Sequence, residues 1–228
     1  MLSWLPENVS SYGSDMDSLL RLILYIVGVW FVLAEVVLIG FLVVYRKKPG
    51  KRAAWVPGSN LKQLSWVLLP CVVILGLDLA IEAAGAPVWH TIKQTLPDPD
   101  LTVRVSGKQF AWDFTHPGED GQLDTDDDIK SEFDLYVPVD SVVQFELVSE
   151  DVIHSFWLPH LRLKQDVVPG RSIKGWFEVT KEGIYPIACA ELCGIGHTKM
   201  GARLHVQSLE EHRIWVQSQE PLDEFWEE

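Results

Sequence analysis

The stretch LILYIVGVWFVLAEVVLIGFLVV, residues 22–44, decides the architecture of the chain. It holds 23 residues with a single charged side chain, Glu35. At about 1.5 Å per residue, a helix of this length crosses the roughly 30 Å hydrocarbon core of a bilayer. We therefore expect a transmembrane helix over about residues 22–45.

A second apolar stretch covers about residues 64–89 and is interrupted by Asp78, Glu82 and Pro70. Taken alone it is also compatible with a buried core helix, but beside the first stretch we interpret it as a second span. The segment between the spans carries six basic residues and no acidic one: Arg46, Lys47, Lys48, Lys51, Arg52 and Lys62. Positive charge marks cytoplasmic loops, so both termini are predicted on the periplasmic side of a bacterial inner membrane.

The start of the chain does not resemble a cleaved signal peptide, because it has acidic residues and no basic region before its apolar run. We expect the first helix to be retained, so that residues 1–90 form a membrane anchor and residues 91–228 a periplasmic domain. The net charge of −13 and the pI near 4.9 argue against a nucleic-acid partner. A hydrophobic content of 47% argues against a disordered chain.

The domain after residue 90 is predicted to be an all-β sandwich of seven or more strands. Short β-branched or partly alternating segments at 101–105, 142–148, 173–179 and 202–206 are separated by Pro, Gly and Asp. The acidic segment 117–128 is expected to be a solvated loop. Its alternating Asp124, Asp126 and Asp128 leave a calcium-binding loop as an alternative, although the segment lacks the Gly and the final Glu of an EF-hand loop.

The chemistry is concentrated in CAELCGIGHTKM, residues 189–200. Two thiols, an imidazole and a thioether within twelve residues are soft and borderline ligands that suit copper. The spacing fits neither a four-ligand zinc site nor the Cys-x-x-Cys of a redox dithiol or a c-type haem. The remaining cysteine, Cys71, lies in the second apolar stretch and is expected to pack there.

A second thiol suggests two bridged copper ions, each of which needs a terminal imidazole. His197 supplies one, and the second has four candidates: His116, His154, His160 and His205. We favour His154, because it follows an apolar strand at the point where a ligand can project into a loop cluster.

Together with EDVIHS at 150–155, the motif at 189–200 resembles the binuclear copper centre, CuA, of cytochrome c oxidase subunit II. The resemblance extends over nearly the whole chain, through WVLLP at 66–70 and GKQFAW at 107–112. It implies two N-terminal transmembrane helices followed by a cupredoxin-like β-sandwich.

The resemblance also implies a ligand set. Cys189 and Cys193 would bridge the two copper ions, and His154 and His197 would each bind one. Met200 would be a weak ligand, and Glu191 would bind through its backbone carbonyl. The Glu191 side chain is a further candidate for a magnesium site shared with subunit I.

The implied function is that of subunit II of a haem-copper terminal oxidase. It would accept electrons from a c-type cytochrome or another periplasmic donor and pass them to subunit I, where oxygen is reduced to water with proton pumping. Subunit III is a further expected partner, and Phe110 and Trp112 are the candidates for electron input. The copper subunit of a nitric oxide reductase and a membrane-tethered copper carrier remain alternatives.

Three positions depart from the family pattern. Phe110 occupies the place of a tryptophan at the point of electron input and lacks the indole N–H. Gln63 occupies the place of an acidic residue at the mouth of a proton path. The acidic loop 119–128 is longer and more negative than expected. Its charge suits either the docking of a basic cytochrome c or a solvated surface.

Overall fold

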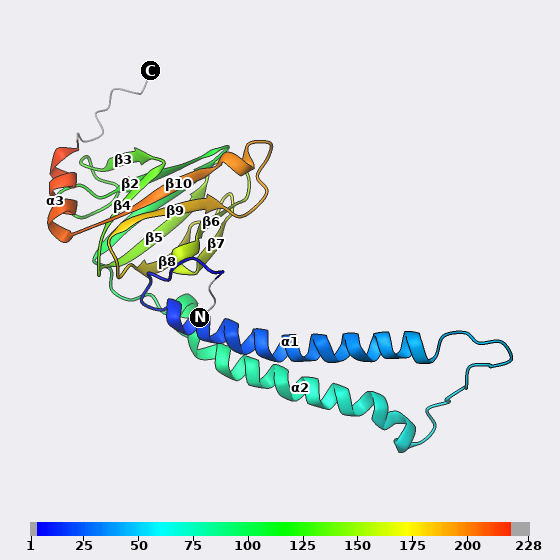
Figure 1. The fold of residues 1–228 in the computed structure, drawn as a ribbon. Coiled ribbons are helices and arrows are strands. Elements are labelled where there is room, and N and C mark those ends of the chain that lie inside the picture. The colour runs from blue at the N-terminus through cyan, green and yellow to red at the C-terminus, as the bar shows by residue number, and fades with distance from the viewer. Residues whose placement is uncertain (1–3, 220–228) are drawn as a thin grey trace. The chain divides into compact units, whose positions relative to one another are not determined.

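The computed structural model describes residues 4–219 of the chain (Figure 1). The chain divides into two compact units. One is a helical hairpin over Asp15–Trp89, and the other combines the described residues up to Ser14 with those from His90 onward. The predicted order of two apolar helices followed by a β-sandwich is confirmed.

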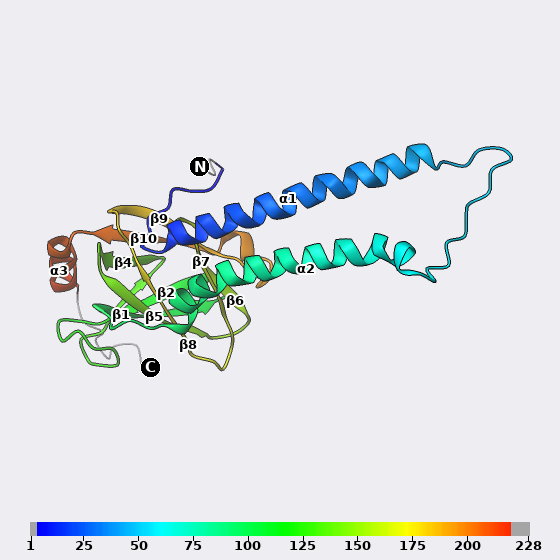
Figure 2. The same ribbon diagram turned by 90° about the horizontal axis from the view of Figure 1, so that it is seen from below.

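The hairpin consists of α1 (Gly13–Val44) and α2 (Leu61–Trp89), which run antiparallel and are joined by the loop 45–60 (Figures 1 and 2). Both helices are long and apolar enough to cross a membrane. Helix α1 begins before the span expected from residue 22. Most of the large apolar side chains of both helices are exposed, as a lipid environment requires.

Gln63, one of the departures from the family pattern, has a structural role at the start of α2. The Asn60 side chain accepts a hydrogen bond from the Gln63 N–H at 3.0 Å, and the Gln63 side chain accepts one from the Ser59 N–H at 3.1 Å. The two bonds satisfy one N–H group of the first helical turn and one just before it.

After the π-helical turn η1 (His90–Gln94), the described chain forms ten strands in two five-stranded sheets, in the orders β3-β2-β1-β5-β8 and β4-β10-β9-β6-β7. The strands are β1 (Leu101–Lys108), β2 (Ala111–His116), β3 (Ile129–Glu132), β4 (Asp134–Pro138), β5 (Val142–Ser149), β6 (His154–Leu158), β7 (Leu163–Val167), β8 (Ile173–Glu178), β9 (Gly183–Cys189) and β10 (Gly201–Gln207). The pairs β1/β5 and β4/β10 are parallel, and the other pairs are antiparallel.

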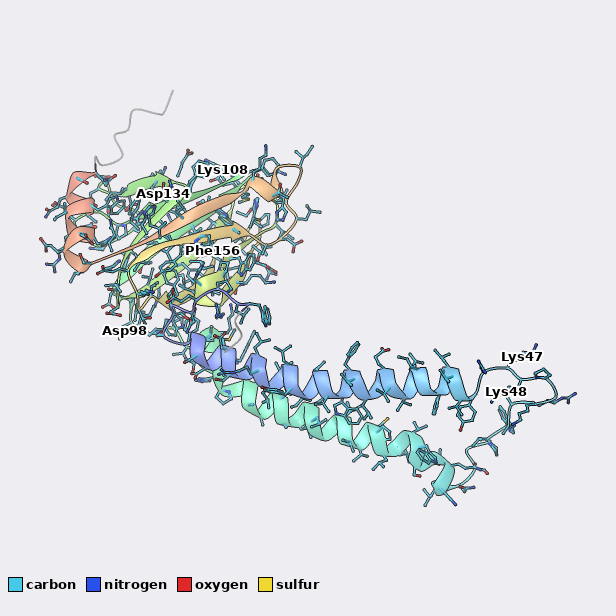
Figure 3. All side chains as sticks on the ribbon, in the orientation of Figure 1. Lys47, Lys48, Asp98, Lys108, Asp134 and Phe156 are labelled. Carbon is cyan, nitrogen blue, oxygen red and sulfur yellow. The ribbon has the colours of Figure 1, made fainter. Side chains whose placement is uncertain are left out.

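Aromatic side chains form the centre of the sandwich core. Phe156 on β6, labelled in Figure 3, is fully buried, with its ring centroid 6.1 Å from that of Phe145 and 5.4 Å from that of Trp112. A Cβ at Gly175 would overlap the Phe145 ring, so close packing requires glycine there. Because this core extends to Trp112, it also supports the strands that carry the candidate site.

The residues just before α1 pack against the sandwich. Val9 and Tyr12 are buried, the Val9 N–H donates to the His160 carbonyl at 3.0 Å, and the Thr180 N–H donates to the Val9 carbonyl at 2.8 Å. The division expected at residue 90 placed this segment with the membrane anchor. The contacts of this segment could not be predicted from the sequence, because its partners, such as His160, lie far along the chain.

The acidic segment 117–128 lies between β2 and β3 and contains no strand or helix. Its carboxylates bind groups of the same chain: Asp124 pairs with Arg104 at 2.7 Å, and Asp127 accepts from the Thr125 hydroxyl at 2.7 Å. Asp128 is buried and accepts from the Asp124 N–H at 3.0 Å. These contacts support the interpretation as a loop, and they engage Asp124 and one carboxylate oxygen of Asp128 within the chain.

A buried histidine cluster joins the C-terminal helix α3 (Leu209–Ser218) to the sandwich. His116 at the end of β2 accepts a hydrogen bond from the Tyr136 N–H at 3.1 Å, and its ring centroid is 4.9 Å from that of Trp215. Burial, aided by the charge of nearby His212, lowers the pKa of His116 to about 3. Burial also lowers the pKa of His212 to about 4. Both side chains are therefore neutral in the folded chain at neutral pH.

Acid should therefore destabilise the sandwich through these histidines. The unfolded chain binds a proton near the ordinary histidine pKa of 6.5, whereas folded His116 does not until about pH 3, so stability falls as the pH drops from 6.5 toward 3. Each such histidine contributes a slope of up to about 1.4 kcal/mol per pH unit. In His116→Gln, which retains an acceptor for the Tyr136 N–H, we expect the free energy of unfolding to fall less steeply with decreasing pH than in the wild type.

The measurement is denaturant unfolding followed by tryptophan fluorescence between pH 7.5 and 4.5. The exposed His90→Gln variant is the control and should keep the wild-type slope. Equal slopes for wild type and His116→Gln would contradict the prediction.

Candidate metal centre

The site lies where two neighbouring strands and the loop after them meet. His154 is the first residue of β6, and Cys189 is the last residue of β9. Strand pairing sets Phe156 opposite Cys189, which brings the start of β6 to the end of β9. The loop 190–200 then returns to the same point, because the Cys189 N–H donates to the Met200 carbonyl at 3.1 Å.

The sulfur and nitrogen atoms of five side chains form a connected cluster. The Sγ atoms of Cys189 and Cys193 are 3.9 Å apart. Cys189 Sγ lies 4.0 Å from His154 Nδ1, and Cys193 Sγ lies 3.6 Å from His197 Nδ1 and 3.7 Å from Met200 Sδ. Each thiol therefore has an imidazole nitrogen beside it.

Three of these residues offer ligand atoms within 4.8 Å of one another: His154, Cys189 and Cys193. Within residues 4–219 no other group of three His, Cys, Asp or Glu side chains comes so close together. His154 is fully buried and both cysteines are nearly so, whereas His197 is half-buried. The cluster is therefore largely shielded from water and is reached from the side of His197.

Burial opposes the thiolate form of this cluster. Desolvation, reinforced by the neighbouring Cys189, raises the pKa of Cys193 to about 11. Thiolates are the form that binds metals, so a bound cation has to supply the stabilisation that the surroundings withhold. The Glu191 carbonyl oxygen lies 3.2 Å from Cys189 Sγ, while the Glu191 side chain is exposed.

The Asp151 carboxylate orients the His154 ring from the side opposite the thiols. Its Oδ1 lies 2.8 Å from His154 Nε2, the ring nitrogen that faces away from the thiols. Desolvation acts to raise the pKa of Asp151, but hydrogen bonds from His154 and from the Val152 and Gln109 N–H groups outweigh it and lower that pKa. The carboxylate favours a proton on Nε2, which leaves the Nδ1 lone pair directed at the site.

Gln109 connects the two ligand-bearing loops. Its backbone N–H donates to Asp151 Oδ2 at 2.7 Å, and its side-chain amide donates to the Cys193 carbonyl at 2.6 Å. We did not predict roles for Gln109 or Asp151 from the sequence. Both lie inside segments that carried the family resemblance, which was the available signal.

The two aromatic residues proposed for electron input occupy different environments. Phe110 is half-buried, and its ring lies so close to the loop after Cys193 that a Cβ at Gly196 would overlap it. Trp112 is fully buried, with its ring centroid 5.9 Å from that of His154. A Cβ at Gly107 would lie 3.1 Å from both His154 and Trp112, so glycine allows these rings to pack closely.

The other candidate histidines lie apart from the cluster. His205 bonds to Asp134 at 2.6 Å, the His160 ring is 5.2 Å from that of Tyr185, and His116 packs under α3. Of the four candidates for a second imidazole, the structure thus brings His154 to the thiols.

Comparison with known proteins gives concordant matches. The family described as cytochrome c oxidase subunit II, periplasmic domain, matches residues 101–207. The alternative cytochrome c oxidase subunit 2 of Bradyrhizobium diazoefficiens is 30% identical over 243 residues, covering 95% of this chain and 83% of that protein. Cytochrome c oxidase subunit 2 of Thermostichus vulcanus is 30% identical over 261 residues, covering 92% of this chain and 77% of that protein.

A solved structure shares the fold of the β-unit. The crystal structure of the periplasmic domain of subunit II of cytochrome oxidase from Bradyrhizobium japonicum superposes with a TM-score of 0.50 and 28% sequence identity. The match covers 55% of this chain and 96% of that structure.

Proposed function

The chain belongs to the cytochrome c oxidase subunit II family, and we propose that it accepts electrons for its haem-copper oxidase at a binuclear copper centre. The observation that carries the proposal is the pair of buried thiols 3.9 Å apart, each with an imidazole nitrogen beside it. The family is that of an oxidoreductase complex, so the chain works as part of an enzyme.

The residues present fit a pair of copper ions. Thiolate, imidazole and thioether donors are those that copper prefers, and no carboxylate of the kind preferred by magnesium or calcium faces the thiols among the described residues. We propose that Cys189 and Cys193 would hold the ions through their thiolates and that His154 and His197 would each contribute an imidazole. Met200 and the Glu191 carbonyl complete the set.

When bound, the copper pair would supply one-electron redox chemistry shared between two metals. The chain's own residues would keep the geometry fixed while the charge changes. Asp151 holds the His154 ring in one orientation, and Gln109 ties the loop carrying Cys193 to the loop carrying Asp151. A rigid scaffold of this kind limits rearrangement at the site.

Electrons would arrive through Phe110. Its half-buried ring lies on the loop that carries the ligands, whereas Trp112 has no exposed surface to offer a donor. Leu192 and Ile195 on the same loop are 77% and 102% exposed, which gives a donor an apolar contact area. We propose a c-type cytochrome or another periplasmic protein as the donor.

From this site electrons would pass to subunit I, where oxygen is reduced to water with proton pumping, and subunit III would be a further partner. The exposed Glu191 carboxylate is available for a magnesium ion shared with subunit I. The anchor would comprise the hairpin of residues 15–89, and the periplasmic domain would combine the segment before the hairpin with the residues from 90 onward. Both termini would face the periplasm of a bacterial inner membrane, because the basic loop favours the cytoplasm.

Copper stoichiometry and electron paramagnetic resonance of the purified full chain test the central proposal. We expect two copper ions per chain and one unpaired electron shared between them. Cys193→Ser should abolish the shared signal because it removes one bridging sulfur. Cys71→Ser, which changes the exposed cysteine of α2, is the matched control and should leave the signal unchanged.

One copper ion per chain, or none, in a correctly folded protein would contradict a binuclear centre. A copper carrier or a metal-free structural subunit would then become the leading explanation.

Loss of the Asp151 carboxylate should weaken metal binding without removing a ligand. In Asp151→Asn we expect copper affinity to fall about 10- to 100-fold, because the charge that orients His154 Nε2 is lost. Competition with a chelator measures the affinity. Asp98→Asn, at an exposed aspartate (Figure 3), is the control, and equal affinities in the two variants would count against the orienting role.

The role of Phe110 can be measured with a reduced c-type cytochrome as donor. Phe110→Leu should lower the second-order rate of electron transfer about 10-fold, an effect of roughly 1.4 kcal/mol, because the ring contact with the donor is lost. The copper spectrum should persist. Phe133→Leu alters an exposed phenylalanine elsewhere on the domain and should leave the rate unchanged. An unchanged rate in Phe110→Leu would move electron input to another residue.

A further inference from the structure

The loop between α1 and α2 gathers positive charge around one hollow. The hollow has a volume of about 830 Å³ and is bordered by nine residues. Five of them are basic: Arg46, Lys47, Lys48, Lys51 and Arg52. Figure 3 labels Lys47 and Lys48 on this loop, at the end of the hairpin where α1 finishes and α2 starts.

These five cations differ from several basic residues of the sandwich. Arg104, Lys181 and Arg203 each form an ion pair with a carboxylate at 2.7–2.8 Å. None of the five loop cations has a carboxylate within 4.0 Å among the described residues, and the loop segment 45–60 contains no acidic residue. Five like charges around one hollow repel one another, so an external anion would stabilise them.

The hollow is contiguous with the apolar span. Val44, the last residue of α1, and Tyr45 line it together with the cations, and Ala53 and Ala54 complete its apolar wall. Tyr45, Trp55 and Trp66 are 76%, 87% and 83% exposed at this end of the hairpin. Aromatic residues of this kind concentrate at the level of lipid headgroups. The cations therefore follow directly on the segment that would sit in the hydrocarbon core.

We propose that this hollow binds the phosphate of an anionic phospholipid headgroup. The inference rests on the proposed placement of the hairpin in a membrane. Arg46 and Arg52 can each offer paired N–H donors to phosphate oxygens, and the lysines add point charges. The apolar wall of Val44, Ala53 and Ala54 suits the glycerol and first methylenes of a lipid, which a free phosphate does not have.

Native mass spectrometry of the purified full chain in detergent tests the proposal, with phosphatidylglycerol, phosphatidylcholine or inorganic phosphate added. We expect phosphatidylglycerol to bind more tightly than phosphatidylcholine. In the triple variant Lys47→Gln, Lys48→Gln and Lys51→Gln, binding of phosphatidylglycerol should weaken on the order of 10- to 100-fold.

Two matched triple variants serve as controls. The first control replaces three exposed basic residues of the sandwich: Lys164→Gln, Arg171→Gln and Lys174→Gln. It changes the net charge by the same amount as the loop Gln variant and should keep wild-type lipid binding. The second control keeps the charge of the loop by means of Lys47→Arg, Lys48→Arg and Lys51→Arg. It should also bind phosphatidylglycerol as the wild type does.

Equal retention of the two lipids, or an unchanged affinity in the loop Gln variant, would overturn the proposal. Displacement of phosphatidylglycerol by equimolar inorganic phosphate would overturn it as well, because the hollow would then be a site for free anions. Trypsin cleavage of the loop in inside-out membrane vesicles tests the placement separately. An uncut loop there would refute the membrane placement, whereas lipid binding in detergent does not depend on orientation.

Discussion

The pairing of β6 with β9 is the interaction on which the site depends. His154 and Cys189 are far apart in the sequence, and the register that sets Phe156 opposite Cys189 brings their ring nitrogen and sulfur to 4.0 Å. A slip of one residue would turn His154 to the other face of its sheet. The aromatic core prevents such a slip, because Phe156 is fully buried and packs against both Phe145 and Trp112.

The loop between β9 and β10 shows how a short, irregular segment acquires a fixed shape. Its ends are joined by the hydrogen bond from Cys189 to Met200, and its middle is held by the Gln109 amide on the Cys193 carbonyl. Phe110 fills the space beside Gly194 and Gly196. The turn between β1 and β2 thus supplies both a polar and an apolar contact to a loop that has no regular structure of its own along most of its length.

Sequence patterns predicted the two spans, the β-sandwich and the cysteine-histidine-methionine motif, because each is a local signal of period, length or spacing. His154 was favoured among four histidines because it follows an apolar strand, and the family resemblance also implied it; the structure places it first in β6 and brings it to the thiols. The contacts of Gln109 and Asp151 could not be predicted. Gln109 bonds to Asp151, 42 positions away, and to Cys193, 84 positions away, and hydrogen bonds between such distant residues leave no periodic pattern in the sequence. The same holds for Val9 and Tyr12, which pack against parts of the sandwich that lie far away in the sequence.

The need to balance charge explains the contrast between the copper-ligand cluster of the sandwich and the basic loop 45–60. In the sandwich, Asp151 and Asp124 each have a partner that stabilises their charge, whereas burial disfavours the thiolate of Cys193, which a cation would stabilise. In the loop 45–60 the relation is reversed, because no carboxylate of residues 4–219 pairs with its cations. A folded chain tolerates unbalanced groups of this kind when a ligand supplies the opposite charge. In our two proposals, a metal would supply the balancing charge at the thiols, and an anionic phospholipid would supply it at the basic loop.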